Sequence, residues 1–205
     1  MRLVLASNNA KKLIELQTLF APLALDLVNQ AALGIHEADE PHLSFVENAL
    51  AKARHAAQQA GGAAIADDSG LCVDALNGAP GVLSARYAML FGQPKTDPDN
   101  NRVLLEKMQL VSERSARFVS ALVAVRSADD PEPLVAMGRW HGRLLTEPQG
   151  AQGFGYDPLL FIPEFNCSVA ELSAELKNKH SHRAIAATDM LAQMREVWRA
   201  VLHLG

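Results

Sequence analysis

The sequence has few cysteines, no excess of basic residues and no long hydrophobic run. Its 205 residues include only Cys72 and Cys167, too few for a disulfide framework or a zinc site. We expect both thiols to stay reduced, in or near the core of a cytoplasmic protein. Lys and Arg number 19 against 23 Asp and Glu, a formal charge of −4, which argues against a nucleic-acid binder. Apolar runs such as 121–125 fall far short of the roughly 20 residues that span a bilayer, and 3–6 is too short for a signal peptide, so we expect no membrane partner.

The residues that are present predict one folded α/β domain. Hydrophobic residues make up 49% of the chain and charged residues 20%, which is ordinary for globular proteins and excludes a wholly disordered chain. Because no repeat or linker divides the chain, we expect a single domain over 1–205, with two lobes, a cleft between them and a mixed sheet. Hydrophobic periodicity predicts strands at 2–6, 23–27, 63–66, 117–126, 134–144 and 159–162, and helices at 11–20, 45–59, 82–90, 102–108, 169–176 and 181–202.

The polar segment from Ser7 to Lys12 lies between the first predicted strand and the first predicted helix. A helix N-terminus offers unpaired amides and a partial positive charge, which suit a phosphate group. The segment is not a P-loop, because it lacks both glycines and the Lys-Ser/Thr pair. The alternative, a helix cap followed by two solvated lysines, stays open on this segment alone.

Two adjacent acids, Asp67 and Asp68, follow the apolar run 63–66 and precede Ser69 and Gly70. Open α/β sheets bind ligands beyond the carboxyl ends of their strands, so one acid is expected to face a cleft. There it would bind Mg²⁺ or take a proton from water. The alternative is an Asx turn with Gly70 at a positive φ. The acidic loop that contains Glu37, Asp39 and Glu40 becomes a candidate metal site if one of these residues shares a magnesium ion with Asp68.

Two further segments are candidates for substrate binding. The loop 153–158 places Phe154 and Tyr156 between glycines, which indicates either a stacking platform for a nucleobase or a tight turn with aromatics in the core. His182 and Arg183 begin the last predicted helix, where cations oppose the helix dipole, and Lys177 lies just before them. Residue types that are unfavourable for the local structure can indicate a functional role. The alternative is that both side chains are polar residues exposed to solvent.

Five stretches spread over nearly the whole chain form one set: LASNNAKKLIEL, SFVENALAKARHAA, AIADDSGLCVDALNGAPGVLSARYA, GFGYDPLLFIP and AELSAELKNKHSHR. In this set and spacing the sequence resembles the inosine triphosphate pyrophosphatase family, which hydrolyses non-standard purine nucleoside triphosphates such as ITP, dITP and XTP. The resemblance implies an elongated, two-lobed α/β fold, with a long mixed central sheet flanked by helices and an active-site cleft between the lobes. It also implies a homodimer that cleans the nucleotide pool.

The resemblance also implies the site residues. Glu40 and Asp68 match the magnesium ligands, and Asp68 matches the proton acceptor. The implied substrate-binding residues are Ser7, Asn8, Asn9, Ala10, Lys11, Lys12, Lys52, Ser69, Phe154, Gly155, Tyr156, Asp157, Lys177, His182 and Arg183. Lys11 stands where many members have glycine, and 91–101 is longer than the family pattern, which leaves the local backbone open at both places.

We therefore expect Mg²⁺-assisted attack of water on the α-phosphorus, with Asp68 as base, to give a nucleoside monophosphate and pyrophosphate. A septum-inhibitor type of pyrophosphatase is disfavoured, because its first loop reads Ser-Pro-Arg-Arg where this chain has Asn8 to Lys12 after Ser7. A non-catalytic nucleotide sensor is disfavoured because both Glu40 and Asp68 are present.

Overall fold

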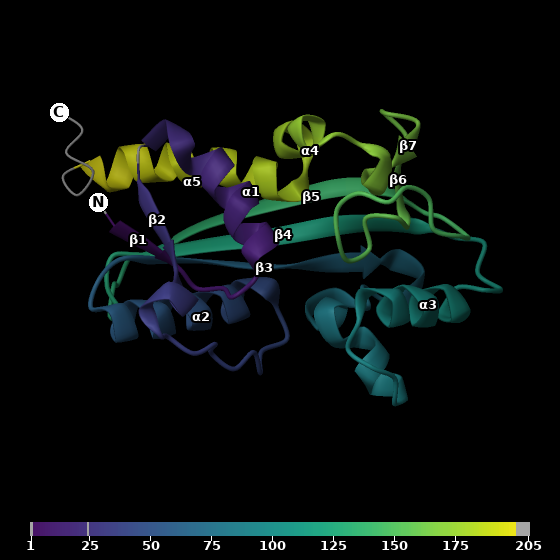
Figure 1. Ribbon diagram of the computed structural model, residues 1–205, viewed down its shortest axis with the longest axis horizontal. Helices are drawn as coiled ribbons and strands as arrows, with labels where there is room; N and C mark the ends of the chain where they lie inside the picture. The colour runs from purple at the N-terminus through teal and green to yellow at the C-terminus, as the bar shows by residue number, and fades with distance from the viewer. Residues whose placement is uncertain (1, 24, 200–205) are drawn as a thin grey trace. The chain divides into compact units, whose positions relative to one another are not determined.

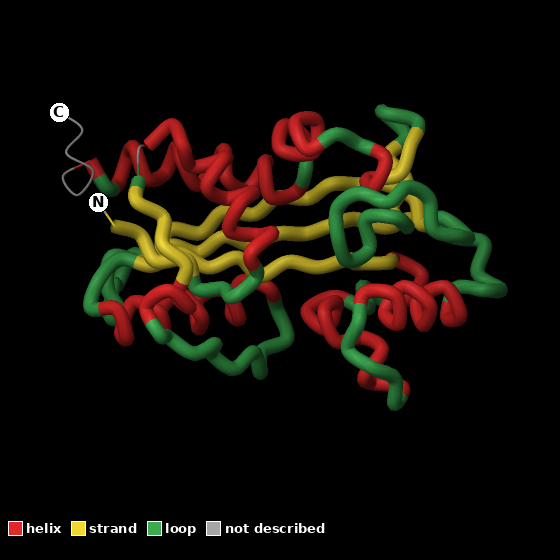
Figure 2. Tube along the Cα trace, viewed as in Figure 1, coloured by secondary structure: helices red, strands yellow, loops and turns green. Residues whose placement is uncertain are grey.

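A computed structural model describes residues 2–23 and 25–199 (Figures 1 and 2). Its seven-stranded sheet has the order β2-β1-β3-β4-β5-β6-β7. Strand β1 is parallel to β2 and β3, whereas β6 is antiparallel to β5 and β7. The predicted α/β class with a mixed sheet and flanking helices is therefore confirmed. The strands are β1 Arg2–Leu5, β2 Asp26–Asn29, β3 Ala64–Val73, β4 Ser115–Val125, β5 Leu134–Leu144, β6 Leu160–Ile162 and β7 Cys167–Ser168, and the α-helices are α1 Ala10–Phe20, α2 Phe45–Ala60, α3 Asp97–Lys107, α4 Ala174–His180 and α5 His182–Val197.

The chain forms two compact units. Unit 1 draws on Met1–Asp68, Ser120–Gly138 and His182–Gly205, and unit 2 on Ser69–Val119 and Arg139–Ser181. Each is described by itself below. The single domain over 1–205, the elongated shape and the cleft between lobes stay predictions. Over 2–23 and 25–199, no helix combines the length and the apolar character needed to cross a bilayer.

Unit 1 has a hydrophobic cluster on each face of its part of the sheet. Side chains of a strand alternate between the faces. Leu3 and Leu5 pack in one cluster with residues of α1 and α5, and Val4 packs in the other with alanines of α2. Figure 1 accordingly shows α1 and α5 on one side of the strands and α2 on the other. The same alternation in β3 puts Ile65 on the α1/α5 face and Ala64 on the α2 face.

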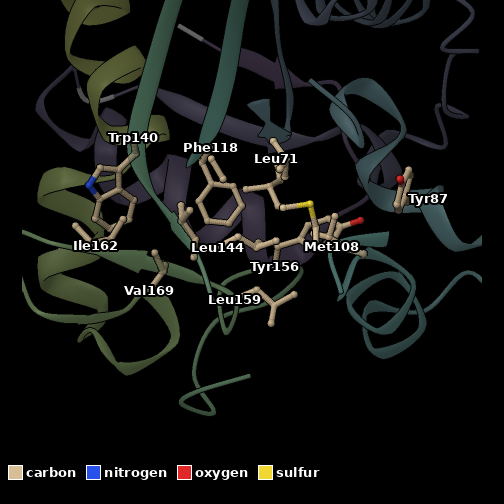
Figure 3. Packing of buried hydrophobic residues seen from close by; sticks show 14 of the residues in the cluster. Leu71, Tyr87, Met108, Phe118, Trp140, Leu144, Tyr156, Leu159, Ile162 and Val169 are labelled. Carbon is tan, nitrogen blue, oxygen red and sulfur yellow. The ribbon is translucent and has the colours of Figure 1, made fainter. Parts of the chain in front are cut away.

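Unit 2 has one hydrophobic core (Figure 3). Leu71 of β3, Phe118 of β4 and Leu144 of β5 belong to it, together with Tyr156 of the glycine-rich loop. The Tyr156 hydroxyl donates a hydrogen bond of 2.9 Å to the Ser84 carbonyl. A buried phenol thus keeps a partner for its polar end, as buried tyrosines generally do.

Strand β3 differs from the sequence prediction in a way that changes the site. It was expected to end at residue 66, but it continues to Val73 through both aspartates. The Asx-turn alternative is wrong, because Gly70 lies inside this strand. A Cβ on Gly70 would approach the Ser84 Oγ to 2.4 Å and the Gly81 carbonyl to 2.5 Å, so glycine is required by close packing.

Several element boundaries also differ from prediction. The strand expected at 23–27 lies at Asp26–Asn29, and the helix expected at 82–90 is a 3₁₀ segment with a non-helical Arg86. Helix α3 begins five residues earlier than expected, at Asp97, because the Thr96 side chain caps it. Strand β7 was not predicted.

The last two predicted helices are also changed. The segment 169–176 is a 3₁₀ turn followed by α4, separated by Leu172 in an extended conformation at ψ 145°. Helix α5 ends at Val197, and residues 200–202 of the expected helix lie outside the described residues. Its buried face is formed by alanines and methionines together with His182 and Arg183, whereas Ile185 is 42% exposed.

We expect Gly138→Ala to lower the free energy of unfolding by about 2–3 kcal/mol, because adding an atom to a tightly packed region destabilises the fold by that amount. A Cβ on Gly138 would meet the His182 carbonyl oxygen at 1.8 Å and the Ala186 amide at 2.7 Å, so α5 fits against β5 only with glycine there. The measurement is urea denaturation followed by circular dichroism. Gly62→Ala is the control, since its Cβ meets nothing within 4 Å. Equal stability of the two variants would contradict this close approach.

Candidate active site

Asp67 and Asp68 point to opposite faces of β3, because successive side chains of a strand alternate. Asp67 shares the α1/α5 face with Ile65, and Asp68 shares the α2 face with Ala64. The expected position just beyond the strand end is therefore wrong. Both acids are buried within the strand, so each needs its own compensating partners.

Asp68 is paired with Glu40 through a single lysine. The Nζ atom of Lys52, on α2, lies 2.8 Å from Asp68 Oδ1 and 2.9 Å from Glu40 Oε1. The two predicted metal ligands thus lie close together although they are far apart in sequence. Among the described residues, the buried Asp68 Oδ2 has no hydrogen-bond partner. An unsatisfied buried carboxylate oxygen is costly and marks a position for a ligand or a proton.

The pKa values of this group follow from its burial. Burial has the largest effect on Asp68 and raises its pKa above the ordinary value, while Lys52 acts in the opposite direction. Burial lowers the pKa of Lys52, but Asp68 and Glu40 together outweigh it, so that pKa lies above the ordinary value. Lys52 is therefore cationic at neutral pH, and Asp68 is a stronger base than an exposed aspartate.

Asp67 forms a separate cluster on the other face. Its Oδ2 lies 3.0 Å from Lys12 Nζ on α1 and 3.1 Å from Arg183 Nε on α5, and its Oδ1 accepts a 2.7 Å hydrogen bond from Ser120. Arg183 also pairs with Glu15 of α1. Burial alone raises the pKa of Asp67, but the two cations and the Ser120 hydroxyl outweigh burial and hold that pKa well below the ordinary value.

The loop before α1 is organised by its own side chains. Asn9 caps the helix, and its Oδ1 accepts from the amides of Lys11 at 3.0 Å and Lys12 at 3.2 Å. The prediction that the first amides of this helix are unpaired is wrong for these two. Ser7 Oγ accepts from the Asn9 amide, and Asn8 Oδ1 accepts from Gln30. Asn8 to Lys11 are exposed, whereas Lys12 is drawn towards Asp67 instead of being solvated.

Unit 2 brings together three of its predicted residues. Lys177 Nζ lies 2.8 Å from Asp157 Oδ2 and 4.6 Å from the centroid of the Phe154 ring. The Gly155 amide donates to Asp97 Oδ2 at 2.8 Å. Of the two aromatics, Tyr156 belongs to the core, and Phe154 is half-buried beneath a cation. The core alternative is thus confirmed for Tyr156, whereas the role of Phe154 as a stacking platform for a nucleobase stays a prediction.

The remaining predicted residues are placed as follows. Ser69 follows Asp68 in β3 and is half-buried, and Ala10 is the exposed first residue of α1. His182 and Arg183 start α5, as expected, but both are buried rather than exposed. Their nucleoside-binding roles stay predictions.

The second cluster contains three residues that were not predicted from the sequence, Asp67, Glu15 and Ser120. The adjacent acids were a signal, but only one of them was assigned a role. Alternation along β3 would have predicted a second cluster on the opposite face, had the strand been extended through residue 68. No local signal indicated Glu15 or Ser120, because each is defined by a partner distant in sequence.

A family model described as the Ham1 family matches residues 3–193. The chain belongs to the Ham1 family. It is 61% identical over 208 residues to a protein of Methylibium petroleiphilum named dITP/XTP pyrophosphatase, with 98% of this chain and 100% of that protein covered. The resemblance drawn from the five sequence stretches is thus confirmed.

Solved structures agree with this assignment of the Ham1 chain. A HAM1 protein from Coxiella burnetii superposes with a TM-score of 0.88 at 41% identity, covering 96% of this chain and 100% of that one. The Ham1 protein of Staphylococcus aureus gives 0.84 at 34% identity, covering 96% and 99%. The mixed sheet with flanking helices is therefore the fold of the family.

The carboxylates of this Ham1 chain suit a divalent cation of the magnesium type. Among residues 2–23 and 25–199, no group of three or more His, Cys, Asp or Glu side chains is arranged to hold a metal by itself. Mg²⁺ usually takes one or two carboxylates and completes its shell with water and substrate phosphates. Glu40 and Asp68 provide such a pair, no residue in the described part of the chain bonds to Asp68 Oδ2, and both carboxylates already hold the Lys52 ammonium.

Proposed function

We propose that this Ham1 chain hydrolyses non-standard purine nucleoside triphosphates, namely ITP, dITP and XTP, to the monophosphate and pyrophosphate. The observation that carries the proposal is the Glu40–Lys52–Asp68 group, in which a buried carboxylate oxygen, left without a hydrogen bond by the residues that the structure describes, lies beside a lysine. The name dITP/XTP pyrophosphatase, carried by relatives that cover nearly the whole chain, supports the same substrate class.

We propose that Glu40 and Asp68 hold Mg²⁺. The charges of unit 1 support a requirement for a cation, because a triphosphate adds several negative charges to a site already rich in carboxylates. The two clusters contain three cations, Lys12, Lys52 and Arg183, and four carboxylates, Glu15, Glu40, Asp67 and Asp68. When bound, Mg²⁺ would neutralise charge on the phosphate oxygens and on the leaving pyrophosphate.

In the proposed reaction Asp68 acts as the general base. Its Oδ2 would accept a proton from a water molecule, whose oxygen forms a bond to the α-phosphorus as the bond from that phosphorus to the bridging oxygen breaks. The electron pair of the broken bond leaves with pyrophosphate. The raised pKa of Asp68 favours proton acceptance. Lys12 and Lys52 would bind the phosphates, with polar contacts from Ser7 to Lys11, and fix the line of attack.

We assign recognition of the nucleoside to the residues that the resemblance implied. The Phe154 ring and the Lys177 ammonium of unit 2 offer a stacking face and a donor, and His182 and Arg183 are the assigned residues of unit 1. Hypoxanthine and xanthine carry a keto oxygen at position 6, whereas adenine carries an amino group there. Donors aimed at that oxygen would be left unpaired with adenine, at about 1–3 kcal/mol each. The homodimer and the cytoplasmic location stay predictions.

The proposal is tested by pyrophosphate release from a panel of triphosphates with Mg²⁺ present. We expect kcat/KM for ITP, dITP and XTP to exceed that for ATP by roughly 100-fold, since two unpaired donors give a discrimination of that size. Pyrimidine triphosphates serve as a second comparison set. Similar kcat/KM values across the panel would overturn the selectivity, and release of orthophosphate instead of pyrophosphate would overturn the reaction.

A further inference from the structure

We infer that Asp67 is a positioning residue, which acts through Lys12 and fixes its ammonium at the Asp67 carbonyl, where Lys52 also binds. The inference rests on the proposed function, because it assigns a role within the same site. Asp67 has no exposed side-chain surface, while 17% of the Lys12 side chain is exposed. A ligand in solution can therefore reach Lys12 but not the Asp67 carboxylate, so any effect of Asp67 on catalysis must pass through its neighbours.

The backbone of Asp67 adds a second point of attachment. Its carbonyl oxygen lies 3.1 Å from Lys52 Nζ and 3.5 Å from Lys12 Nζ. Two ammonium groups, one from each helix layer, thus meet at one residue of β3. The carboxylate of Asp67 holds Lys12 on one face of the strand, and the next residue, Asp68, holds Lys52 on the other. The spacing between the two lysines is therefore set by β3.

Stability alone does not account for these charges. Burying an ion pair costs desolvation that offsets most of the attraction, and apolar side chains of similar size often serve equally well. The cluster instead gives a long, flexible lysine a defined position. Lysine loses substantial side-chain entropy when it is ordered. The ion pair with Asp67 orders the Lys12 side chain before a triphosphate binds, so that this entropy is not lost during binding. Such preorganisation raises the rate of a reaction that depends on alignment.

Glu15 provides a matched comparison within the same cluster. Both carboxylates pair with Arg183, and Asp67 also pairs with Lys12. Asp67→Asn and Glu15→Gln each remove one negative charge and keep the side-chain shape. The first removes a carboxylate that lies 3.0 Å from Lys12 Nζ, whereas the second leaves that ion pair in place.

The experiment is a double-mutant cycle on pyrophosphate release from ITP with Mg²⁺, using the wild type, Asp67→Asn, Lys12→Met and the double variant. We expect Asp67→Asn to lower kcat by roughly 10- to 100-fold when Lys12 is present, because misplaced groups cost that much. In the Lys12→Met background we expect the same change to matter by less than about threefold, as it does for a residue acting only through its partner. Glu15→Gln should lower kcat less than Asp67→Asn does, because it leaves the 3.0 Å ion pair between Asp67 and Lys12 in place.

An equal fold-loss from Asp67→Asn in both backgrounds would overturn the inference, because a purely structural role reduces the active fraction whether or not Lys12 is present. Thermal melting of each variant establishes that it is folded. If Asp67→Asn does not fold, Ser120→Ala replaces it, since this change removes a hydrogen bond from Asp67 but keeps the carboxylate, and the same two outcomes decide. If the wild type releases no pyrophosphate from any triphosphate, the proposed function fails. If the wild type releases pyrophosphate but the fold-losses of Asp67→Asn and Lys12→Met simply multiply in the double variant, only the role of Asp67 fails.

Discussion

Asp68→Asn is expected to lower kcat for ITP by about 1000-fold or more while leaving the protein folded, because general-base catalysis alone contributes about 10²–10⁴-fold. The amide cannot accept the proton of the attacking water, and it withdraws one of the two carboxylates proposed to hold Mg²⁺. The fold should tolerate the change, since asparagine has the same shape and Lys52 keeps Glu40 as a partner at 2.9 Å. Stopped assays of pyrophosphate release at saturating ITP measure the loss, and thermal melting checks the fold.

Asp26→Asn is the control for this variant. The side chain of Asp26 is 68% exposed and lies in β2, also in unit 1. We expect its kcat to stay within about twofold of the wild type, since exposed substitutions away from a site have small effects. Wild-type turnover by Asp68→Asn would show that another group accepts the proton, and the assignment of Asp68 would be withdrawn.

Removing divalent cations is expected to reduce activity by at least about 100-fold, since a catalytic metal ion contributes several kcal/mol and each 1.4 kcal/mol is tenfold. The physical reason lies in the charges of unit 1. Lys52 is already engaged with Glu40 and Asp68, and Lys12 with Asp67. The cations of the two clusters are thus matched by carboxylates and leave little positive charge for a triphosphate. The measurement is pyrophosphate release after exhaustive treatment with EDTA.

Two additions complete the chelation experiment. Excess Mg²⁺ should restore activity in full, which excludes a direct effect of EDTA on the chain. Circular dichroism should stay unchanged during chelation, because the Lys52 ammonium keeps Glu40 and Asp68 together without a metal ion. Full activity in the presence of the chelator would contradict the proposed role of the two carboxylates.

The parts of the fold that the sequence predicts well are those specified by local residues. Helix α2, predicted at 45–59, begins at Phe45 after its Ser44 cap and ends before Gly61, which takes a left-handed conformation at φ 64°. Strand β1 and helix α1 likewise lie within one residue of prediction. These limits depend on caps and short apolar runs, whose energetics do not involve distant partners.

The errors have a different physical origin. The apolar run 63–66 is followed by two acids, which predicts that the strand stops before Asp67. It continues because Lys12, Lys52 and Arg183 arrive from three different helices to neutralise the two acids. No sequence pattern specifies that convergence, because the partners lie 16 to 116 positions away. The pairing of Glu40 with Asp68 was recovered only through the family resemblance.

The opposite orientation of Asp67 and Asp68 also limits how the gene can change. Adding or deleting one codon within 64–66 would turn each following side chain of the strand to the other face of the sheet. The two acids would exchange faces, and the proposed base would face Lys12 and Arg183. The segment 34–39, which precedes Glu40, has no such parity, since it is not part of a strand. Length variation among descendants of this gene should therefore accumulate in that segment, whereas in β3 it should occur only by even steps.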